Sequence, residues 1–327
     1  MKAVIITRPG GPEVLEIQDR PTPEAGIGQI RVKVRASALN RADLLQRAGN
    51  YPLPPGSPED IAGMEYAGEV DALGQGVQLW KKGDRVMGII GGGGHAELVT
   101  VHEREAMAMP SGMSWENAAA IPEVFLTAYD ALFTRLNLRP GETLLIHAVG
   151  SGVGTAAVQL ARLIGARVIG TARSAEKLAR VKELGLDTGI DASSGDWATA
   201  IEQEVRANSV DAILDLVGGN YLEGNLRVLA LKGRIVVVGL PAGYVAQLNM
   251  GILLRKRGTI VGTTLRARPI EEKIALARDF SARMIPYFES GRLKPIVDRV
   301  LHFDQIADAH RAMEANATLG KLVLIWR

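Results

Sequence analysis

The chain has 327 residues, a length that is typical of two domains. Hydrophobic residues make up 47% and charged residues 23% of the sequence, a composition that excludes a largely disordered chain. The formal net charge of +2 lacks the basic excess of most proteins that bind nucleic acid or anionic membranes, so neither partner is expected.

The absence of cysteine excludes disulfides, a cysteine nucleophile, iron–sulfur clusters and cysteine-ligated zinc. No two of the five histidines are three or four residues apart, so no helical metal-binding pair exists and we expect no metal site. The sequence shows no signal-peptide pattern and no uncharged apolar window of 18 residues, and we therefore expect a cytoplasmic protein.

The first 122 residues predict short strands and turns without intervening helices. Residues 2–7 form an apolar run, and residues 29–38 alternate between apolar and polar side chains as in a half-buried strand. A turn at residues 83–88 leads into another strand, and the prolines of residues 52–58 indicate an irregular loop. This part of the chain is expected to be a mostly β domain.

From residue 123 onwards, predicted strands alternate with helices. An apolar strand at 144–149 precedes a helix at 152–164, and a strand at 167–172 precedes a helix at 175–184. Three further strands are expected at residues 210–217, 233–240 and 259–264. This alternation predicts right-handed βαβ units and a parallel sheet.

The last 60 residues predict a long amphipathic helix at 270–290, a strand at 297–302, a helix at 303–315 and a strand at 321–326. We expect this tail to return to the first domain. The expected fold is therefore α/β, with one domain formed by residues 1–122 and 269–327 and a nucleotide-binding domain formed by residues 123–268.

A glycine-rich turn joins the strand at 144–149 to the helix at 152–164. Such a turn lets the backbone approach a pyrophosphate, and the helix N-terminus offers unpaired amides and a positive dipole end. The spacing differs from the usual G-x-G-x-x-G pattern, so Gly150 and Gly152 are expected to make the turn; a purely structural turn is the alternative. The expected cofactor-binding residues here are Gly150, Ser151, Gly152, Val153 and Gly154.

The next strand indicates which cofactor is bound. An NAD-binding unit usually has Asp or Glu about 20 residues past the glycine loop, where the carboxylate binds the ribose hydroxyls. Here Arg173, Ser174 and Lys177 occupy that place, and an arginine suits the geometry of a 2′-phosphate. The sequence favours NADPH over NADH. The alternative is that Arg173 and Lys177 are solvated residues at the start of a helix.

Several segments in a fixed order resemble the medium-chain dehydrogenase/reductase superfamily over essentially the whole chain. These are residues 40–43 (NRAD), 63–70 (GMEYAGEV), 82–86 (KGDRV), 119–122 (AAIP) with 127–128 (TA), and 148–154 (AVGSGVG). The last segment has the family's A-x-x-[GS]-G-V-G form, which accounts for its unusual spacing. The resemblance implies a Rossmann NADPH-binding domain and a GroES-like, mostly β catalytic domain.

The zinc-binding branch of this superfamily uses a cysteine and the histidine of a Gly-His-Glu segment as ligands. Met64 stands in place of that histidine, and no cysteine is present. The resemblance is therefore to the zinc-free quinone oxidoreductase branch, and within it to the tumour-suppressor-inducible quinone oxidoreductase group. A tyrosine that this group has near the adenosine phosphate corresponds to Ala192 here, and Arg173 is expected to substitute for it.

The resemblance implies hydride transfer from a nicotinamide without a metal or a protein nucleophile. The oxyanion that develops on the acceptor then needs hydrogen-bond donors, and Asn40 and Tyr51 are the candidate catalytic residues. Their structural alternatives are a backbone-capping amide for Asn40 and loop packing for Tyr51. The resemblance also implies further cofactor contacts at Thr127, Val217, Gly239, Leu240 and Leu265.

The leading functional hypothesis is an NADPH-dependent quinone oxidoreductase acting on small quinones. The alternatives are an NADPH-dependent reductase of enones or enoyl thioesters, and an NADPH-binding regulatory or RNA-binding protein with little turnover. Family members commonly join their sheets edge to edge, so a homodimer through strand 259–264 is expected. His147, Asp215 and Glu65 are interpreted as structural residues and His95 as a turn residue.

Overall fold

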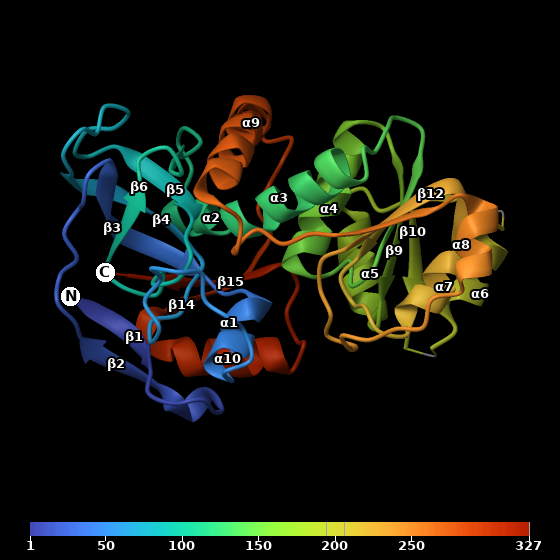
Figure 1. Cartoon of the computed structure of the whole chain (residues 1–327), viewed down its shortest axis with the longest axis horizontal. Helices are drawn as coiled ribbons and strands as arrows, with labels where there is room; N and C mark the ends of the chain where they lie inside the picture. The colour runs from blue at the N-terminus through green and yellow to red at the C-terminus, as the bar shows by residue number, and fades with distance from the viewer. Residues whose placement is uncertain (194, 206, 327) are drawn as a thin grey trace. The chain divides into compact units, whose positions relative to one another are not determined.

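The computed structural model describes residues 1–193, 195–205 and 207–326 of the chain (Figure 1). The chain divides into two compact units, one made of residues 1–126 and 265–327 and the other of residues 127–264. Each boundary between the units lies four residues from the position expected from sequence (126 against 122, and 264 against 268).

The first unit contains a seven-stranded sheet in the order β14-β15-β3-β4-β5-β7, with β6 paired to β3 outside this path. The strands are β3 (Gln29–Ala38), β4 (Glu65–Leu73), β5 (Arg85–Ile89), β6 (Leu98–His102), β7 (Met107–Ala108), β14 (Val297–His302) and β15 (Lys321–Ile325). Strand β15 runs antiparallel to β3 with Val323 opposite Ala38, so the end of the chain completes a sheet begun near its start.

The rest of this unit consists of short helices, one long helix and a separate two-stranded ribbon. They are β1 (Lys2–Ile6), η1 (Pro12–Val14), β2 (Leu15–Asp19), α1 (Arg41–Arg47), α2 (Trp115–Ala119), α3 (Pro122–Tyr129, which runs into the second unit), α9 (Ile270–Glu289), η3 (Phe303–Gln305) and α10 (Ile306–Glu314). The alternation of β3 buries Ile30, Val32 and Val34 while Lys33 stays exposed. The three buried side chains pack in one hydrophobic core together with residues of β15 and α10.

The second unit contains a six-stranded parallel sheet in the order β10-β9-β8-β11-β12-β13. Its elements are η2 (Asp130–Arg135), β8 (Thr143–Ile146), α4 (Gly152–Leu163), β9 (Arg167–Ala172), α5 (Ala175–Lys182), β10 (Thr188–Asp191), α6 (Trp197–Glu204), β11 (Val210–Asp215), α7 (Tyr221–Val228), β12 (Leu229–Val237), α8 (Met250–Lys256) and β13 (Thr259–Gly262). The strand order reverses between β8 and β11, and ligands of such sheets bind at the carboxyl ends of the strands beside this point. The expected α/β class, with a mostly β unit and a parallel-sheet unit, is confirmed.

The strand boundaries that differ most from those expected are those of β8 and β12. Strand β8 ends at Ile146 rather than at residue 149, because Ala148 adopts a left-handed conformation (φ 47°) that ends the extended backbone. Strand β12 spans Leu229–Val237 rather than residues 233–240. Further elements of this unit were not expected from the sequence, among them β10, α6, α7 and α8.

A buried arginine joins three distant segments of the first unit. Arg47 donates to the carbonyl oxygen of Gly10 over 2.9 Å and lies 3.0 Å from Nδ1 of His310, and it pairs with the Glu314 carboxylate. Because a guanidinium only donates, Nδ1 of His310 accepts and the proton is on Nε2. Burial lowers the pKa of His310 to about 3, so the imidazole is neutral at physiological pH.

Among residues 1–193, 195–205 and 207–326, no helix combines the length and the apolar composition needed to cross a membrane.

Candidate functional site

The glycine turn after β8 leads directly into α4, which Ser151 caps. The Ser151 hydroxyl oxygen accepts a hydrogen bond from the Gly154 amide over 3.1 Å. Other amides in the first turn, including those of Gly152 and Val153, have no partner within the helix, and the helix dipole adds positive potential there. This helix end therefore suits a phosphate group.

Gly154 is required by packing. A Cβ atom at this position would lie 2.5 Å from the carbonyl oxygen of Val149, a backbone atom that cannot move aside. Gly170 of β9 has a similar role, because its Cβ would lie 2.7 Å from a methyl group of Val149. The two glycines let α4 approach the sheet closely. The left-handed residue of the turn is Ala148, which the sequence analysis did not anticipate.

The predicted phosphate-binding residues of the second strand follow β9. Arg173 is exposed, and the Ser174 hydroxyl oxygen accepts from the Lys177 amide over 3.3 Å as the N-cap of α5. Arg173 also lies near Tyr221 of α7: burial raises the pKa of that phenol, and the guanidinium opposes the shift. No acidic residue stands at this strand end.

The other expected cofactor residues of the second unit follow two adjacent strands. Val217 follows β11, and Gly239 and Leu240 follow β12. A Cβ on Gly218 would lie 2.6 Å from a Leu240 methyl group, so the two strand ends lie close together. The carboxyl ends of β8, β9, β11 and β12 thus present these residues along one edge of the sheet. Thr127 is buried in α3, and Leu265 is buried at the start of the first unit's returning segment.

A buried chain of hydrogen bonds holds these strand ends together. One Asp215 carboxylate oxygen accepts from the amides of Val217 and Gly218, each over 2.8 Å, and the other accepts from Nδ2 of Asn225 over 3.0 Å. The Asn225 oxygen faces Nε2 of His147 over 2.7 Å, and Nδ1 of His147 lies 2.9 Å from the Thr171 hydroxyl.

The chain sets the tautomer of His147. Since the Asn225 amide nitrogen donates to Asp215, its oxygen must accept, so Nε2 of His147 carries the proton and Nδ1 accepts from Thr171. Burial lowers the pKa of His147, although Asp215 opposes this shift, and the ring stays neutral. The structural interpretations of His147 and Asp215 are confirmed, whereas the link through Asn225 was not expected.

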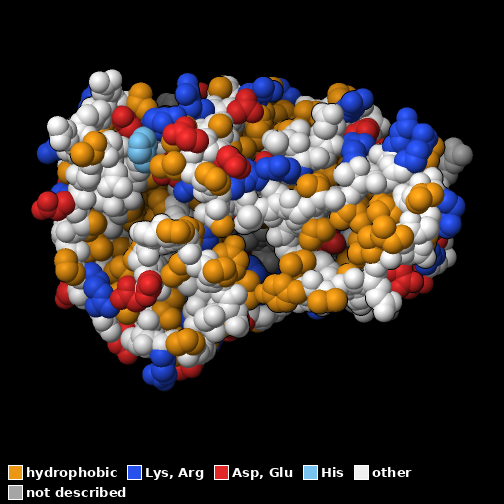
Figure 2. Space-filling view, in the orientation of Figure 1, with side chains coloured by type: hydrophobic (Ala, Val, Ile, Leu, Met, Phe, Trp, Pro, Cys, Tyr) orange, Lys and Arg blue, Asp and Glu red, His pale blue; other side chains and the backbone are white. Residues whose placement is uncertain are grey.

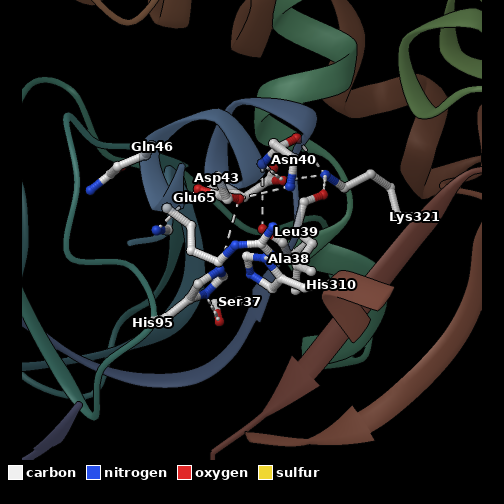
Figure 3. A network of polar contacts seen from close by, with 12 residues as sticks. Ser37, Ala38, Leu39, Asn40, Asp43, Gln46, Glu65, His95, His310 and Lys321 are labelled. Carbon is white, nitrogen blue, oxygen red and sulfur yellow. Dashed lines mark hydrogen bonds and ion pairs between the residues drawn. The ribbon is translucent and has the colours of Figure 1, made fainter. Parts of the chain in front are cut away.

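Asn40, a candidate catalytic residue, lies at the N-terminus of α1 in a buried polar network (Figure 3). Its Oδ1 accepts from Nζ of Lys321 over 2.6 Å. Its Nδ2 donates to Oε1 of Glu65 over 2.9 Å and to the carbonyl oxygen of Ala38 over 3.4 Å. Both amide hydrogens are therefore engaged by the protein itself.

Glu65 and Lys321 form the ion pair at the centre of this network (Figure 3). Nζ of Lys321 lies 2.7 Å from Oε1 of Glu65, and the two side chains are 3% and 0% exposed. The ammonium group also donates to the carbonyl oxygen of Leu39 and to Asn40, so all three of its hydrogens are satisfied. The second Glu65 oxygen accepts from the Glu123 amide over 2.8 Å, and the structural interpretation of Glu65 is confirmed.

Ser37, His95 and Asp43 form a neighbouring cluster that superficially resembles a hydrolase triad (Figure 3). Ser37 Oγ lies 2.9 Å from His95 Nδ1, and His95 Nε2 lies 3.8 Å from the Asp43 carboxylate. All three side chains are fully buried, and Ser37 also accepts from the Trp326 indole over 3.0 Å. Without access to a substrate, this cluster stabilises the core. The His95 backbone lies in a bend, in agreement with its interpretation as a turn residue, and its side chain is part of the core.

Tyr51, the second candidate catalytic residue, is half-buried in the proline-rich loop after α1. Its ring centroid lies 5.1 Å from the guanidinium carbon of Arg266, a residue that the sequence analysis overlooked. Arg266 is only 2% exposed; its Nε donates to the Gly91 carbonyl oxygen and one terminal nitrogen donates to Gln46 Oε1, both over 2.7 Å. Burial lowers its pKa, and Asp43 and Tyr51 oppose the shift. The only sequence signal was its position directly after Leu265.

Met64, which stands where the zinc-binding relatives have histidine, is buried. Within the part of the chain that the structure describes, no group of three or more histidine or acidic side chains could hold a metal ion.

The doubly wound sheet, its glycine turn and the mostly β unit define the class: an α/β protein with the nucleotide-binding fold of nicotinamide-dependent oxidoreductases. The family descriptions "Alcohol dehydrogenase GroES-like domain" and "Zinc-binding dehydrogenase" match residues 26–111 and 152–282.

Two curated relatives agree with this class. The chain is 33% identical to the synaptic vesicle membrane protein VAT-1 homolog of Mus musculus, over 99% of this chain and 84% of that protein. It is also 33% identical to a quinone oxidoreductase of Pseudomonas aeruginosa, over 97% of each chain. The chain belongs to the medium-chain dehydrogenase/reductase family, in its quinone oxidoreductase branch.

Solved structures share this fold. The quinone oxidoreductase of Escherichia coli complexed with NADPH superposes with a TM-score of 0.89 at 29% identity, over all of both chains. An NAD-dependent alcohol dehydrogenase gives 0.88 at 34% identity over all of both chains, and the JamJ enoyl reductase gives 0.88 at 25% identity over 99% of each.

The buried Glu65–Lys321 pair generates a prediction about stability. We expect Lys321→Met to lower the free energy of unfolding by about 3–5 kcal/mol, because it leaves a buried carboxylate without its counter-ion. Urea unfolding followed by tryptophan fluorescence measures this loss, with Lys33→Met on the exposed face of β3 as the matched control.

The double variant Lys321→Met with Glu65→Gln should lose less than the sum of the two single variants, because it removes both charges together. A loss below about 1 kcal/mol for Lys321→Met would contradict the role given to the pair.

Proposed function

We propose that this protein is an NADPH-dependent quinone oxidoreductase that transfers a hydride to small quinones without a metal. The observation on which the proposal rests most is the end of β9, where Arg173, Ser174 and Lys177 stand without an acidic residue. A 2′-phosphate matches this arrangement better than free ribose hydroxyls do. The relatives that are quinone oxidoreductases support the choice of acceptor.

In this proposal the nucleotide lies along the carboxyl edge of the parallel sheet. The first turn of α4, with Ser151, Gly152 and Val153, holds the pyrophosphate, and Gly150 permits the close approach of the nucleotide. Gly154 contributes by letting α4 pack against Val149. Val217, Gly239 and Leu240 line the edge, and the Asp215–Asn225–His147 chain keeps these strand ends in place. Thr127 and Leu265 are proposed to contact the nicotinamide half. The bound cofactor supplies the hydride.

The chain's own residues must position the acceptor and stabilise the charge that develops on it. Tyr51 is proposed to contact the acceptor, since its loop is irregular and its ring half-buried. Asn40 is proposed to act differently from the sequence expectation: with its amide engaged by Lys321, Glu65 and Ala38, it positions the start of α1 and does not donate to substrate.

The alternative acceptors are enones and enoyl thioesters, which the same fold and cofactor can serve. The JamJ enoyl reductase, with its similar fold, keeps this alternative open. A regulatory NADPH-binding protein with little turnover is the remaining alternative.

The first test is NADPH oxidation in the presence of EDTA, with 1,4-benzoquinone, 9,10-phenanthrenequinone or a simple enone as acceptor. We expect quinone-dependent oxidation that EDTA does not reduce, because the proposed mechanism uses no metal. Turnover of the enone alone would favour the alkene reductase. Tight NADPH binding without turnover of any acceptor would favour the regulatory alternative.

Cofactor choice is tested separately by Arg173→Asp. We expect NADPH to bind about 10- to 100-fold more weakly, the effect of losing one charge-assisted hydrogen bond, while NADH binding changes little. Fluorescence titration with both nucleotides measures the two dissociation constants. Arg180→Asp, on the exposed surface of α5, is the charge-matched control. An unchanged preference between NADPH and NADH would rule out this assignment.

We also propose that two copies of the chain associate through β13. This strand pairs with β12 on one side, and within the described residues its other edge has no partner strand. The segment before it exposes large apolar side chains, among them Tyr244, Val245 and Leu254. Figure 2 shows hydrophobic side chains on the surface of the unit that contains α7 and α8. An open apolar edge favours pairing with another strand.

Light scattering should give twice the mass of one chain at micromolar concentration, and Val261→Lys, which places a charge at the edge of β13, should shift the protein towards a monomer. A wild-type monomer across this concentration range would contradict the dimer.

A further inference from the structure

Arg266 is a buried cation that forms no direct ion pair within the described residues. It is 2% exposed, and among the described residues no carboxylate lies at ion-pair distance from it. Its two hydrogen-bond acceptors, the Gly91 carbonyl oxygen and the Gln46 side-chain oxygen, are both neutral. An arginine cannot relieve this burial by losing its proton, so the protein maintains a positive charge at this point.

Two donor groups beside the Arg266 guanidinium have no acceptor in the described structure. These are Nη1 of Arg266 and Nε2 of Gln46, and both nitrogens are buried. Nη2 of Arg266 donates to Oε1 of Gln46, and this hydrogen bond holds the guanidinium beside the amide. Buried donors without acceptors are rare in folded proteins, and a pair of them beside a fixed cation suits an oxygen of negative charge.

We propose that Arg266 and Gln46 form an oxyanion-binding site that stabilises the negatively charged oxygen of the reduced acceptor. This inference rests on the proposed function. When one carbonyl oxygen of a quinone takes up a hydride equivalent from the reduced nicotinamide, the π electrons shift through the ring. The electron pair of the opposite carbonyl bond then moves to its oxygen, and a hydroquinone monoanion forms. A proton from solvent then completes the hydroquinone, so one quinone, one NADPH and one proton give one hydroquinone and NADP⁺.

The site favours the transition state over the bound quinone. A neutral carbonyl oxygen attracts a guanidinium weakly, whereas the oxygen that gains charge during hydride addition attracts it strongly. Since Asn40 has both amide hydrogens engaged, Arg266 and Gln46 replace it as the donors that a zinc-free site requires. The guanidinium is already held by Gly91 and Gln46, so little reorganisation accompanies the reaction.

Tyr51 covers this site. Its ring lies over the guanidinium, with 5.1 Å between the guanidinium carbon and the ring centroid. The loop that contains Tyr51 has Pro52, Pro54 and Pro55, none of which can donate a backbone hydrogen bond. In this proposal, the quinone reaches Nη1 of Arg266 when the Tyr51 ring turns aside.

The first test uses 4-nitrophenol, an aromatic oxyanion that resembles the hydroquinone monoanion and reports its ionisation by absorbance. With NADP⁺ present, we expect the wild-type protein to bind the phenolate and to lower the pKa of bound nitrophenol by about one unit or more. Arg266→Gln should abolish the shift, and Arg266→Lys, which keeps the charge, should restore part of it. Arg299→Gln, an exposed arginine of β14, is the matched control.

An equal pKa of bound nitrophenol in wild type and Arg266→Gln, or no binding to either, would overturn the inference. The NADP⁺ dissociation constant and the melting temperature of each variant show whether it is folded. If Arg266→Gln does not fold, Gln46→Leu removes the second donor and should weaken nitrophenolate binding without changing the NADP⁺ dissociation constant.

Kinetics distinguish this inference from the proposed function. If the wild type reduces quinones, Arg266→Gln should lower kcat about 10²- to 10³-fold with a smaller change in KM, as expected for a lost oxyanion donor. If the wild type turns over and Arg266→Gln has an unchanged kcat, the role of Arg266 is refuted and the proposed function is not. A wild type that reduces no acceptor, but whose nitrophenolate binding depends on Arg266, would refute the proposed function and leave the site standing.

Discussion

The buried ion pair between Glu65 and Lys321 is the interaction on which the first unit depends. It joins β4 to β15, two strands separated by most of the chain, and through Asn40 and the Glu123 amide it reaches the starts of α1 and α3. Two charges in a dry interior are stable only when nearly every donor and acceptor is matched. Here three acceptors surround the ammonium group, and the carboxylate receives three donors. That requirement specifies the positions of the segments it joins.

In the second unit, a chain of hydrogen bonds takes the place of a buried ion pair. Thr171, His147, Asn225 and Asp215 link β9, β8, α7 and β11 just where the order of the strands reverses. Because Asp215 accepts from two successive amides, the turn after β11 is held in one conformation. The neutral, singly protonated His147 lets the chain of hydrogen bonds run in one direction. The edge that suits a dinucleotide is thereby built on a rigid base.

These networks also change which polar groups are available for chemistry. Asn40 has the residue type of an oxyanion donor, yet Lys321, Glu65 and Ala38 engage its amide. The only sequence signal for Arg266 was its position after Leu265, yet burial leaves one of its terminal nitrogens without an acceptor in the described structure. In a protein without the cysteine and histidine ligands of its zinc-binding relatives, a guanidinium held beside an amide is a physically reasonable source of positive potential.

The sequence by itself determined the α/β class, the glycine turn before α4, the lack of an acid after β9 and the return of the tail to the first sheet. These features depend on local periodicity and on residue types at short spacing, which are readable along the chain. Only the tertiary structure decided that His95 lies in the core, that Asn40 is engaged and that Arg266 is buried beside Tyr51. Such facts depend on contacts between residues as distant as 40 and 321 or 46 and 266, and no local pattern encodes them.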